Sequence, residues 1–274
     1  MVAPEDDRIR TCGELVPVPR RQRTDPDRDP RLERDADLVL DGKYHEHYCD
    51  KSWPCPVCAY LDGRRIRGKL AVHFGAWLSA GGSLGILTLG PAHSPDESLA
   101  PLWGHLQIGR QATMRGGWTQ DKQTYGIAAY AWATEVVETA EGCWNPHCHI
   151  ALLLARPLGL DQIADLRART ADRFTDAVVK AGGRASAHAQ DLKMREGTAG
   201  ELAHYLTKSH TNIRPLSQRQ DGSRTHLEVL ADLADTGEGY ERWREFTAAS
   251  AHQQRFRCSN DIADVVAQRG HLLG

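Results

Sequence analysis

The chain lacks several features that would assign it at once to a broad class. It has no run of about 18 apolar residues, the length that a membrane-spanning helix needs, so we expect no membrane span. No basic and apolar segment opens the sequence, which predicts no secretory signal and a cytoplasmic location. Basic residues are not in excess, because 34 Lys and Arg stand against 36 Asp and Glu. Broad, nonspecific coating of DNA is therefore not expected, although a local basic surface is compatible with this balance.

Two histidines lie two residues apart in an apolar segment, residues 146–154, that is typical of a β-strand. Side chains alternate across a strand, so His147 and His149 are expected on one face. Two neutral imidazoles on one face can form half of a metal site. A hydrogen-bonded pair of core histidines is the simpler alternative.

A second group of polar residues follows in a segment that is expected to be a helix after Gly200. Glu201, Tyr205 and Lys208 are spaced so that they share one helical stripe. A strand-borne metal facing a phenol and a cation is typical of phosphoryl transfer, in which a hydroxyl attacks phosphorus in line. We expect Tyr205 to be the nucleophile and Lys208 to stabilise charge on the phosphate or lower the pKa of the phenol. An ordinary amphipathic helix with a solvated Glu and Lys is the alternative.

These motifs resemble those of the HUH endonucleases, and specifically the single-Tyr branch of the rolling-circle replication initiators of small actinobacterial plasmids. Three motifs carry the resemblance: residues 86–93 with 99–103 resemble the family's first motif, residues 142–154 the second and residues 201–208 the third. Residues 228–259 resemble the tail of actinobacterial plasmid initiators, so the resemblance covers most of the chain from about residue 44. The chain departs from the family at Gly90 and Asn145, where Thr and His are often found.

The resemblance implies a protein that nicks one strand at a plasmid origin, forms a 5′-phosphotyrosine link through Tyr205 and leaves a 3′-hydroxyl primer. Its partners would be origin DNA, single-stranded at the nick, and a host helicase and DNA polymerase that follow. The resemblance also implies that Glu201, one helical turn from the phenol, activates the water that finally releases the protein. A relaxase or transposase with the same chemistry is one alternative. A non-catalytic zinc-knuckle DNA-binding regulator is another.

A third ligand for the histidine pair is expected from the preceding strand, residues 125–138. An antiparallel neighbour could bring Glu135 beside the imidazoles, and the family places an acidic residue there. Glu138 is the alternative, but it lies nearer the connecting loop and is expected to be a solvated edge charge. Such a site could hold zinc, whereas the hard phosphate ligand and the family both favour Mg²⁺ or Mn²⁺.

A second metal signal lies upstream, in the sequence Cys-Pro-Val-Cys that ends at residue 58. We expect Cys49, Cys55 and Cys58 to bind a structural zinc ion. Three residues are candidates for the fourth ligand: His47, which we name first, His45 and the distant Cys12. A redox Cys-x-x-Cys pair or simple buried thiols are the alternatives. The odd total of seven cysteines suits a reducing compartment better than a disulfide framework.

A basic cluster follows this knuckle at the start of an expected helix. Its members are Arg64, Arg65, Arg67 and Lys69. They are candidates for contacts to DNA phosphates, and a solvated helix face is the alternative.

The sequence divides into a charged and disordered arm, a zinc-knuckle segment with the basic helix, an HUH nuclease core and a helical tail. The boundaries are residues 1–38, 39–82, 83–212 and 213–274. The expected elements of the core are a strand at 84–90, a helix at 97–114, strands at 125–138 and 146–154, a helix from an Asp161 N-cap to a Gly182 stop, a strand at 184–192 and the helix of Tyr205. This order predicts an α+β fold, an HUH endonuclease-like core with a mostly antiparallel sheet flanked by helices, as the resemblance also implies.

Overall fold

The computed structural model describes residues 9, 12–17, 44–46, 48–211, 213–214, 219 and 222–271. The expected arm, residues 1–38, and His47 therefore lie largely or wholly outside the described residues. The chain divides into two compact units, Met1–Asp62 and Gly63–Gly274. None of the described helices is both long and apolar enough to cross a membrane.

The first unit contains two short strands and the start of a long helix. β1 (Leu15–Pro17) pairs with β2 (Tyr44–Glu46) in an antiparallel ribbon. Helix α2 (Pro56–Ser79) begins inside the Cys-Pro-Val-Cys sequence, with proline at its first position, where a missing amide hydrogen has no cost. The expected start of this helix at the basic cluster was wrong, because that cluster lies in the interior of α2.

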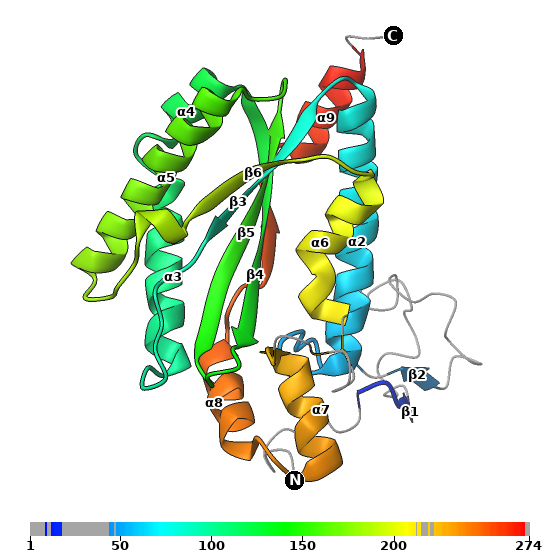
Figure 1. Ribbon diagram of the computed structural model, residues 1–274. Coiled ribbons are helices and arrows are strands. Elements are labelled where there is room, and N and C mark those ends of the chain that lie inside the picture. The colour runs from blue at the N-terminus through cyan, green and yellow to red at the C-terminus, as the bar shows by residue number, and fades with distance from the viewer. Residues whose placement is uncertain are drawn as a thin grey trace. The chain divides into compact units, whose positions relative to one another are not determined.

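The second unit is built on a six-stranded sheet (Figure 1). Its strands are β3 (Ser83–Leu89), β4 (Ile127–Glu138), β5 (Trp144–Leu154), β6 (Asp191–Arg195), β7 (Arg224–Thr225) and β8 (Phe256–Cys258). The order is β6-β3-β5-β4-β7, and β8 also pairs with β4. Every pairing among these described strands is antiparallel, so the α+β class with an antiparallel sheet is confirmed.

Helices cover both faces of this sheet, as Figure 1 shows. Helices α3 (Leu99–Thr113), α4 (Trp118–Tyr125) and α5 (Leu160–Lys180) pack on one face, and α2, α6 (Ala199–Thr211) and α9 (Ile262–His271) pack on the other. Alternation along β5 decides which side chain meets which layer. Ile150 and Leu152 are buried against the first layer, and Ala151 and Leu153 against the second. Burial of apolar side chains on both faces holds the three layers together.

Several expected boundaries were wrong for local reasons. The strand expected at 184–192 is β6, which begins only at Asp191, because a short 3₁₀ turn occupies Ala187–Ala189. Asp161 is not the N-cap of α5, because the helix begins at Leu160 after an N-cap at Gly159. The carboxylate of Asp161 lies instead in the first turn, where it complements the helix dipole. Gly182, with φ of 83°, follows the end of α5 as expected.

The C-terminal segment adds to the sheet as well as to the helices. Helices α7 (His226–Thr236) and α8 (Tyr240–Ser250) follow β7, and β8 then lies along β4. The sheet therefore includes residues far in sequence from the β4–β5 hairpin, because β8 pairs with Ala131, Trp132 and Ala133 of β4.

Candidate metal centres

The central hairpin of the sheet brings three expected ligands together. Glu135 on β4 lies directly opposite His147 on β5, and His149 is two residues further along the same face. Glu135 Oε2 lies 3.3 Å from His147 Nε2 and 3.2 Å from His149 Nε2. Adjacent ligands of an octahedral ion are separated by about 3.0 Å and those of tetrahedral zinc by about 3.4 Å, so both distances from Glu135 fit a metal of either kind. These residues form a group that could hold a metal ion.

Neighbouring groups orient both imidazoles with Nε2 toward the carboxylate. His147 Nδ1 lies 3.1 Å from the carbonyl oxygen of Asn145. Thr88 Oγ1 lies 3.0 Å from His149 Nδ1, across the pairing of β3 with β5. A hydrogen bond at Nδ1 fixes the ring and, when Nδ1 carries the proton, leaves the Nε2 lone pair for a metal. Asn145 thus contributes through its backbone carbonyl.

The strand that carries Thr88 leaves little room beside His147. A Cβ atom at Gly90 would lie 3.2 Å from Cβ of His147. A threonine at this position would require a shift of the imidazole or of the strand end. The absence of a side chain at Gly90 is therefore part of how His147 is placed.

The electrostatic environment of Glu135 and His149 favours the protonation states that bind a cation. Burial raises the pKa of Glu135, but hydrogen bonds from His147 and His149 and the charge of Lys208 hold it well below its usual value. Burial lowers the pKa of His149, although Glu135 opposes this change. At neutral pH the group thus offers an ionised carboxylate and a neutral His149 imidazole, the forms that bind metals.

Helix α6 places the expected nucleophile beside these ligands. The ring centroids of Tyr205 and His149 are 4.9 Å apart. Lys208 Nζ lies 3.3 Å from Glu135 Oε2 and 4.9 Å from the Tyr205 ring centroid. Arg195 adds a second cation, because its Cζ is 4.7 Å from the same centroid and its Nε has no hydrogen-bond partner among the described residues. The Tyr205 ring thus lies next to a candidate metal ligand and two cations.

Glu201 has a different environment from the other two members of its helical stripe. Its Oε2 accepts hydrogen bonds from Thr198 N at 2.8 Å and Thr198 Oγ1 at 2.9 Å, while its own amide donates to Thr198 Oγ1. This is a capping box at the start of α6. The amide and hydroxyl of Thr198 lower the pKa of Glu201, which makes it a weaker base. A role in water activation stays a prediction, and the structure shows a capping role.

Glu138 is buried, so the expectation of a solvated edge charge was wrong. Arg224 from β7 and Arg242 from α8 pair with its carboxylate, the latter at 3.0 Å. Residues 135 and 138 are three apart, and alternation directs their side chains to opposite faces of β4. Glu138 therefore belongs to an ion-pair network and not to the histidine group.

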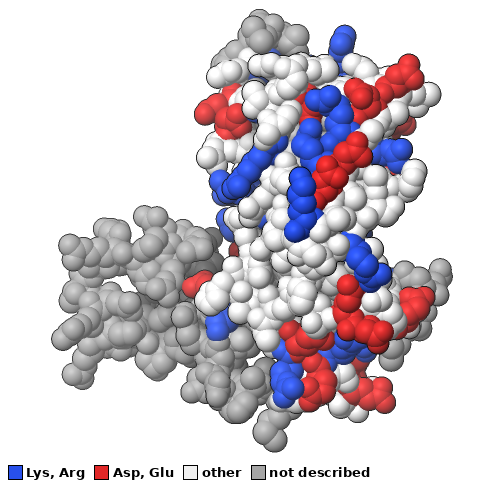
Figure 2. Space-filling model, turned by 90° about the vertical axis from the view of Figure 1, so that its left-hand side faces the viewer, with Lys and Arg blue, Asp and Glu red and all other residues white. Residues whose placement is uncertain are grey.

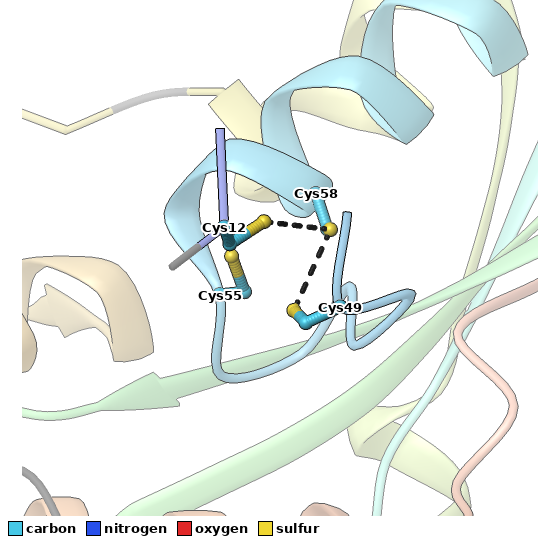
Figure 3. Close-up of side chains that lie close together, drawn as sticks. All are labelled: Cys12, Cys49, Cys55 and Cys58. Carbon is cyan, nitrogen blue, oxygen red and sulfur yellow. Dashed lines mark hydrogen bonds between the residues drawn. The ribbon is translucent and has the colours of Figure 1, made fainter. Parts of the chain in front are cut away.

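The first unit holds the second ligand cluster, which Figure 3 shows. The Sγ atoms of Cys12, Cys49, Cys55 and Cys58 all lie within 4.8 Å of one another. Cys58 Sγ is 3.5 Å from Cys12 Sγ and 3.6 Å from Cys49 Sγ. Hydrogen bonds from the Cys49 and Cys55 thiols lower the pKa of Cys58, so this cluster readily supplies a thiolate. It could bind a metal such as zinc.

The basic cluster on α2 is spread around an amphipathic stretch. Arg64, Arg65 and Lys69 are exposed, whereas Arg67 is half-buried and its Nε donates to Thr207 Oγ1 on α6 at 3.3 Å. Ile66, within the cluster, and Leu70, directly after it, are buried in the core. A role in DNA contact stays a prediction.

A different arginine pair on α5 has an internal role. Arg169 Nε lies 2.8 Å from Asp121 Oδ1, and Arg173 pairs with the other oxygen of this buried carboxylate. Figure 2 shows basic and acidic side chains interspersed on the side of the molecule that carries α4 and α5. Among its described residues, this side of the molecule therefore carries no large surface of purely basic or purely acidic side chains.

Comparison of the chain with protein-family models, with curated proteins and with solved structures found no match. The geometry brings together His147, His149 and Glu135 with Tyr205 and Lys208, and it brings Cys12 to the three expected cysteines. Thr88 and Arg195 were missed by sequence reasoning. Thr88 lies in the first resembling motif, whereas nothing in the sequence around Arg195 distinguishes it from an exposed strand residue.

Proposed function

We propose that this protein is a metal-dependent, site-specific DNA nickase and strand transferase of the HUH type, used as a plasmid rolling-circle replication initiator. The observation that carries the proposal is the position of the Tyr205 ring beside the group of Glu135, His147 and His149. Lys208 contacts both the carboxylate and the ring. Such a combination of hard and imidazole ligands, a phenol and a cation suits attack on a phosphodiester.

In the proposed reaction the Tyr205 oxygen attacks the phosphorus atom and loses its proton. A bond forms between the phenolic oxygen and phosphorus, and the bond from phosphorus to the 3′-oxygen breaks. The 3′-oxygen takes up a proton and becomes the primer hydroxyl, while the 5′ phosphate stays on the protein. Because one phosphoester replaces another, the bond can later be exchanged back without another energy source.

Charge in the site favours this chemistry. Glu135, His147 and His149 would hold Mg²⁺ or Mn²⁺, which supplies Lewis-acid polarisation of the phosphate oxygens. Lys208 and Arg195 lie close to the Tyr205 ring, so they can attract the DNA phosphate to the phenol and stabilise charge on that phosphate. Origin DNA, single-stranded at the nick, would be the substrate. A host helicase and polymerase would extend the primer.

Two other proteins could use similar motifs. A relaxase usually has its Tyr before the histidine pair, whereas Tyr205 follows it, so the order of the motifs favours an initiator. A non-catalytic zinc-knuckle regulator would bind DNA through the cluster around Arg64 and form no covalent product.

The test is the formation of a covalent adduct. Purified protein is mixed with labelled single-stranded DNA that carries either the candidate origin or a randomised central segment, with Mn²⁺ or EDTA, and the products are resolved on a denaturing gel. We expect a metal-dependent adduct with the wild type and with Tyr240→Phe, a matched change of an exposed phenol on α8, and none with Tyr205→Phe. An adduct that survives Tyr205→Phe contradicts the assigned nucleophile, and binding without any adduct on either DNA favours the regulator.

The release step needs a variant that keeps the helix cap. Glutamine can replace glutamate in a capping box, so Glu201→Gln preserves the start of α6 and removes the base. If Glu201 activates water, this variant forms the adduct normally and then accumulates it. Normal release by Glu201→Gln would leave Glu201 with a capping role alone.

A further inference from the structure

Cys12 lies 46 positions before Cys58, yet the two sulfurs are 3.5 Å apart. The other two members of the cluster come from the turn before α2 and from the residue before its first position. Spacing alone predicts the Cys-x-x-Cys pair and its near neighbour Cys49, but it leaves the fourth partner undefined. The fold of the first unit brings the sulfur of Cys12 to the fourth position of the cluster.

The separations match a tetrahedral site better than a disulfide. Four sulfurs at about 2.3 Å from a zinc ion are about 3.8 Å from one another. Cys58 Sγ lies 3.5 Å from Cys12 Sγ and 3.6 Å from Cys49 Sγ, and all separations in the cluster are below 4.8 Å. A disulfide would need two sulfurs at about 2.0 Å. The structure shows all seven cysteines as free thiols.

The surroundings of the sulfurs also suit thiolates that share a metal. Cys49, Cys55 and Cys58 are buried, and Ile9 and Tyr48 pack against the cluster. Asp50 has φ of 57°, a left-handed conformation that is rare for a residue other than glycine. The amides of Asp50 and Lys51 form hydrogen bonds to the sulfurs of Cys58 and Cys49 respectively, so the strained turn supplies donors to negative charge.

We propose that Cys12 is the fourth ligand of a closed four-thiolate zinc site, which ties the N-terminal segment to the knuckle before α2. With four sulfurs in place, His47 is not a ligand. On zinc binding the thiols lose their S–H protons to solvent and four zinc–sulfur bonds form. No position is left for water or substrate, so the site is structural. This inference stands apart from the nuclease, because none of its residues belongs to the histidine group.

Cobalt(II) substitution of the full-length protein tests the ligand set. Sulfur-to-cobalt charge-transfer absorption reports thiolate ligands only, so an ion at Glu135, His147 and His149 does not contribute. We expect the wild type to show a tetrahedral four-thiolate spectrum. Cys12→Ser should lose intensity in proportion to one thiolate of four and bind cobalt more weakly. His47→Ala and Cys258→Ser, a change of a half-buried thiol outside the cluster, should match the wild type.

An unchanged spectrum for Cys12→Ser together with a changed one for His47→Ala would overturn the proposal. A second measurement uses the wild type alone, in case Cys12→Ser does not fold. Zinc-loaded protein is treated with an alkylating reagent before and after a strong chelator, and the peptides are identified by mass spectrometry. We expect Cys12 to become reactive together with Cys49, Cys55 and Cys58 only after chelation. Labelling of Cys12 in the zinc-loaded protein, or a mass that shows a disulfide, would contradict the proposal.

Discussion

The cysteine cluster takes its ligands from a turn, the start of a helix and a residue 46 positions away, whereas the histidine cluster takes its ligands from two paired strands. The first offers four soft sulfurs. The second offers one carboxylate and two imidazoles with a phenol nearby. Closed sulfur sites are typical of structural zinc, and sites with three protein ligands and open positions are typical of catalytic metals.

The two clusters also differ in what holds their ligands in place. Main-chain hydrogen bonds between β4 and β5 fix Glu135 opposite His147, and the apolar layers on both faces support the strands. The first unit has only short strands and few buried apolar side chains among its described residues. Its order should therefore depend on the metal, while the order of the sheet should not.

The largest expected effect is the loss of the cysteine site. Cys58→Ala removes the sulfur that lies 3.5 Å from Cys12 Sγ and 3.6 Å from Cys49 Sγ, and binding of structural zinc contributes about 10–16 kcal/mol in small zinc-dependent folds. We expect complete loss of hydrogen-exchange protection around residues 48–60 and little change in β4 and β5. Wild-type protein without its zinc is the control and should behave in the same way. Equal loss of protection in the sheet would show that the two regions are not independent.

The next prediction compares substitutions of two buried carboxylates on β4, Glu135 and Glu138. Glu135→Gln should abolish Mn²⁺ binding and also lower the free energy of unfolding at neutral pH, because His147, His149 and Lys208 hold the pKa of this carboxylate well below its usual value. Glu138→Gln should leave Mn²⁺ affinity unchanged and destabilise the fold by about 3–5 kcal/mol, because Arg224 and Arg242 lose their partner. Isothermal titration with Mn²⁺ and urea unfolding measure the two effects. The reverse pattern would mean that the ligand is wrongly assigned.

A smaller effect is expected from the group that orients His149. Thr88→Val keeps the shape of the side chain but removes the partner of Nδ1, and loss of such a partner typically lowers metal affinity about 10- to 100-fold. Thr134→Val changes the same residue type on β4, on the opposite face from the ligands, and should have no effect on affinity. Equal affinities of the two variants for Mn²⁺ would exclude an orienting role of Thr88.

The smallest effect is expected at Asp232, a carboxylate that belongs to neither metal cluster. Burial raises the pKa of Asp232, but Arg219 and Arg224 outweigh it and lower that pKa below its usual value. A depressed pKa adds stability above the unfolded-state value, and this stability is lost as the pH falls through the folded-state value. Asp232→Asn should therefore cost about 1 kcal/mol at neutral pH and converge with the wild type in acid. Unfolding measured from pH 7 downward tests this, and a constant difference would contradict it.

Features that depend on neighbours in sequence were predicted well. The period of two places His147 and His149 on one face, and this follows from the geometry of any strand. The choice of Glu135 over Glu138 agrees with the structure, because a hairpin pairs residue 135 with residue 147. The strand expected at 184–192 was misplaced, since no strong periodicity marks where β6 begins.

The sequence by itself determined the composition of both clusters in large part, the α+β class and the stripe that joins Tyr205 to Lys208, because these depend on alternation and helical periodicity. Only the tertiary structure decided that Cys12 meets Cys58, that Thr88 and Arg195 reach His149 and Tyr205, and that Glu138 meets arginines from β7 and α8. These contacts join segments far apart in the chain. Their partners are selected by how the apolar faces pack, and local sequence patterns do not record that selection.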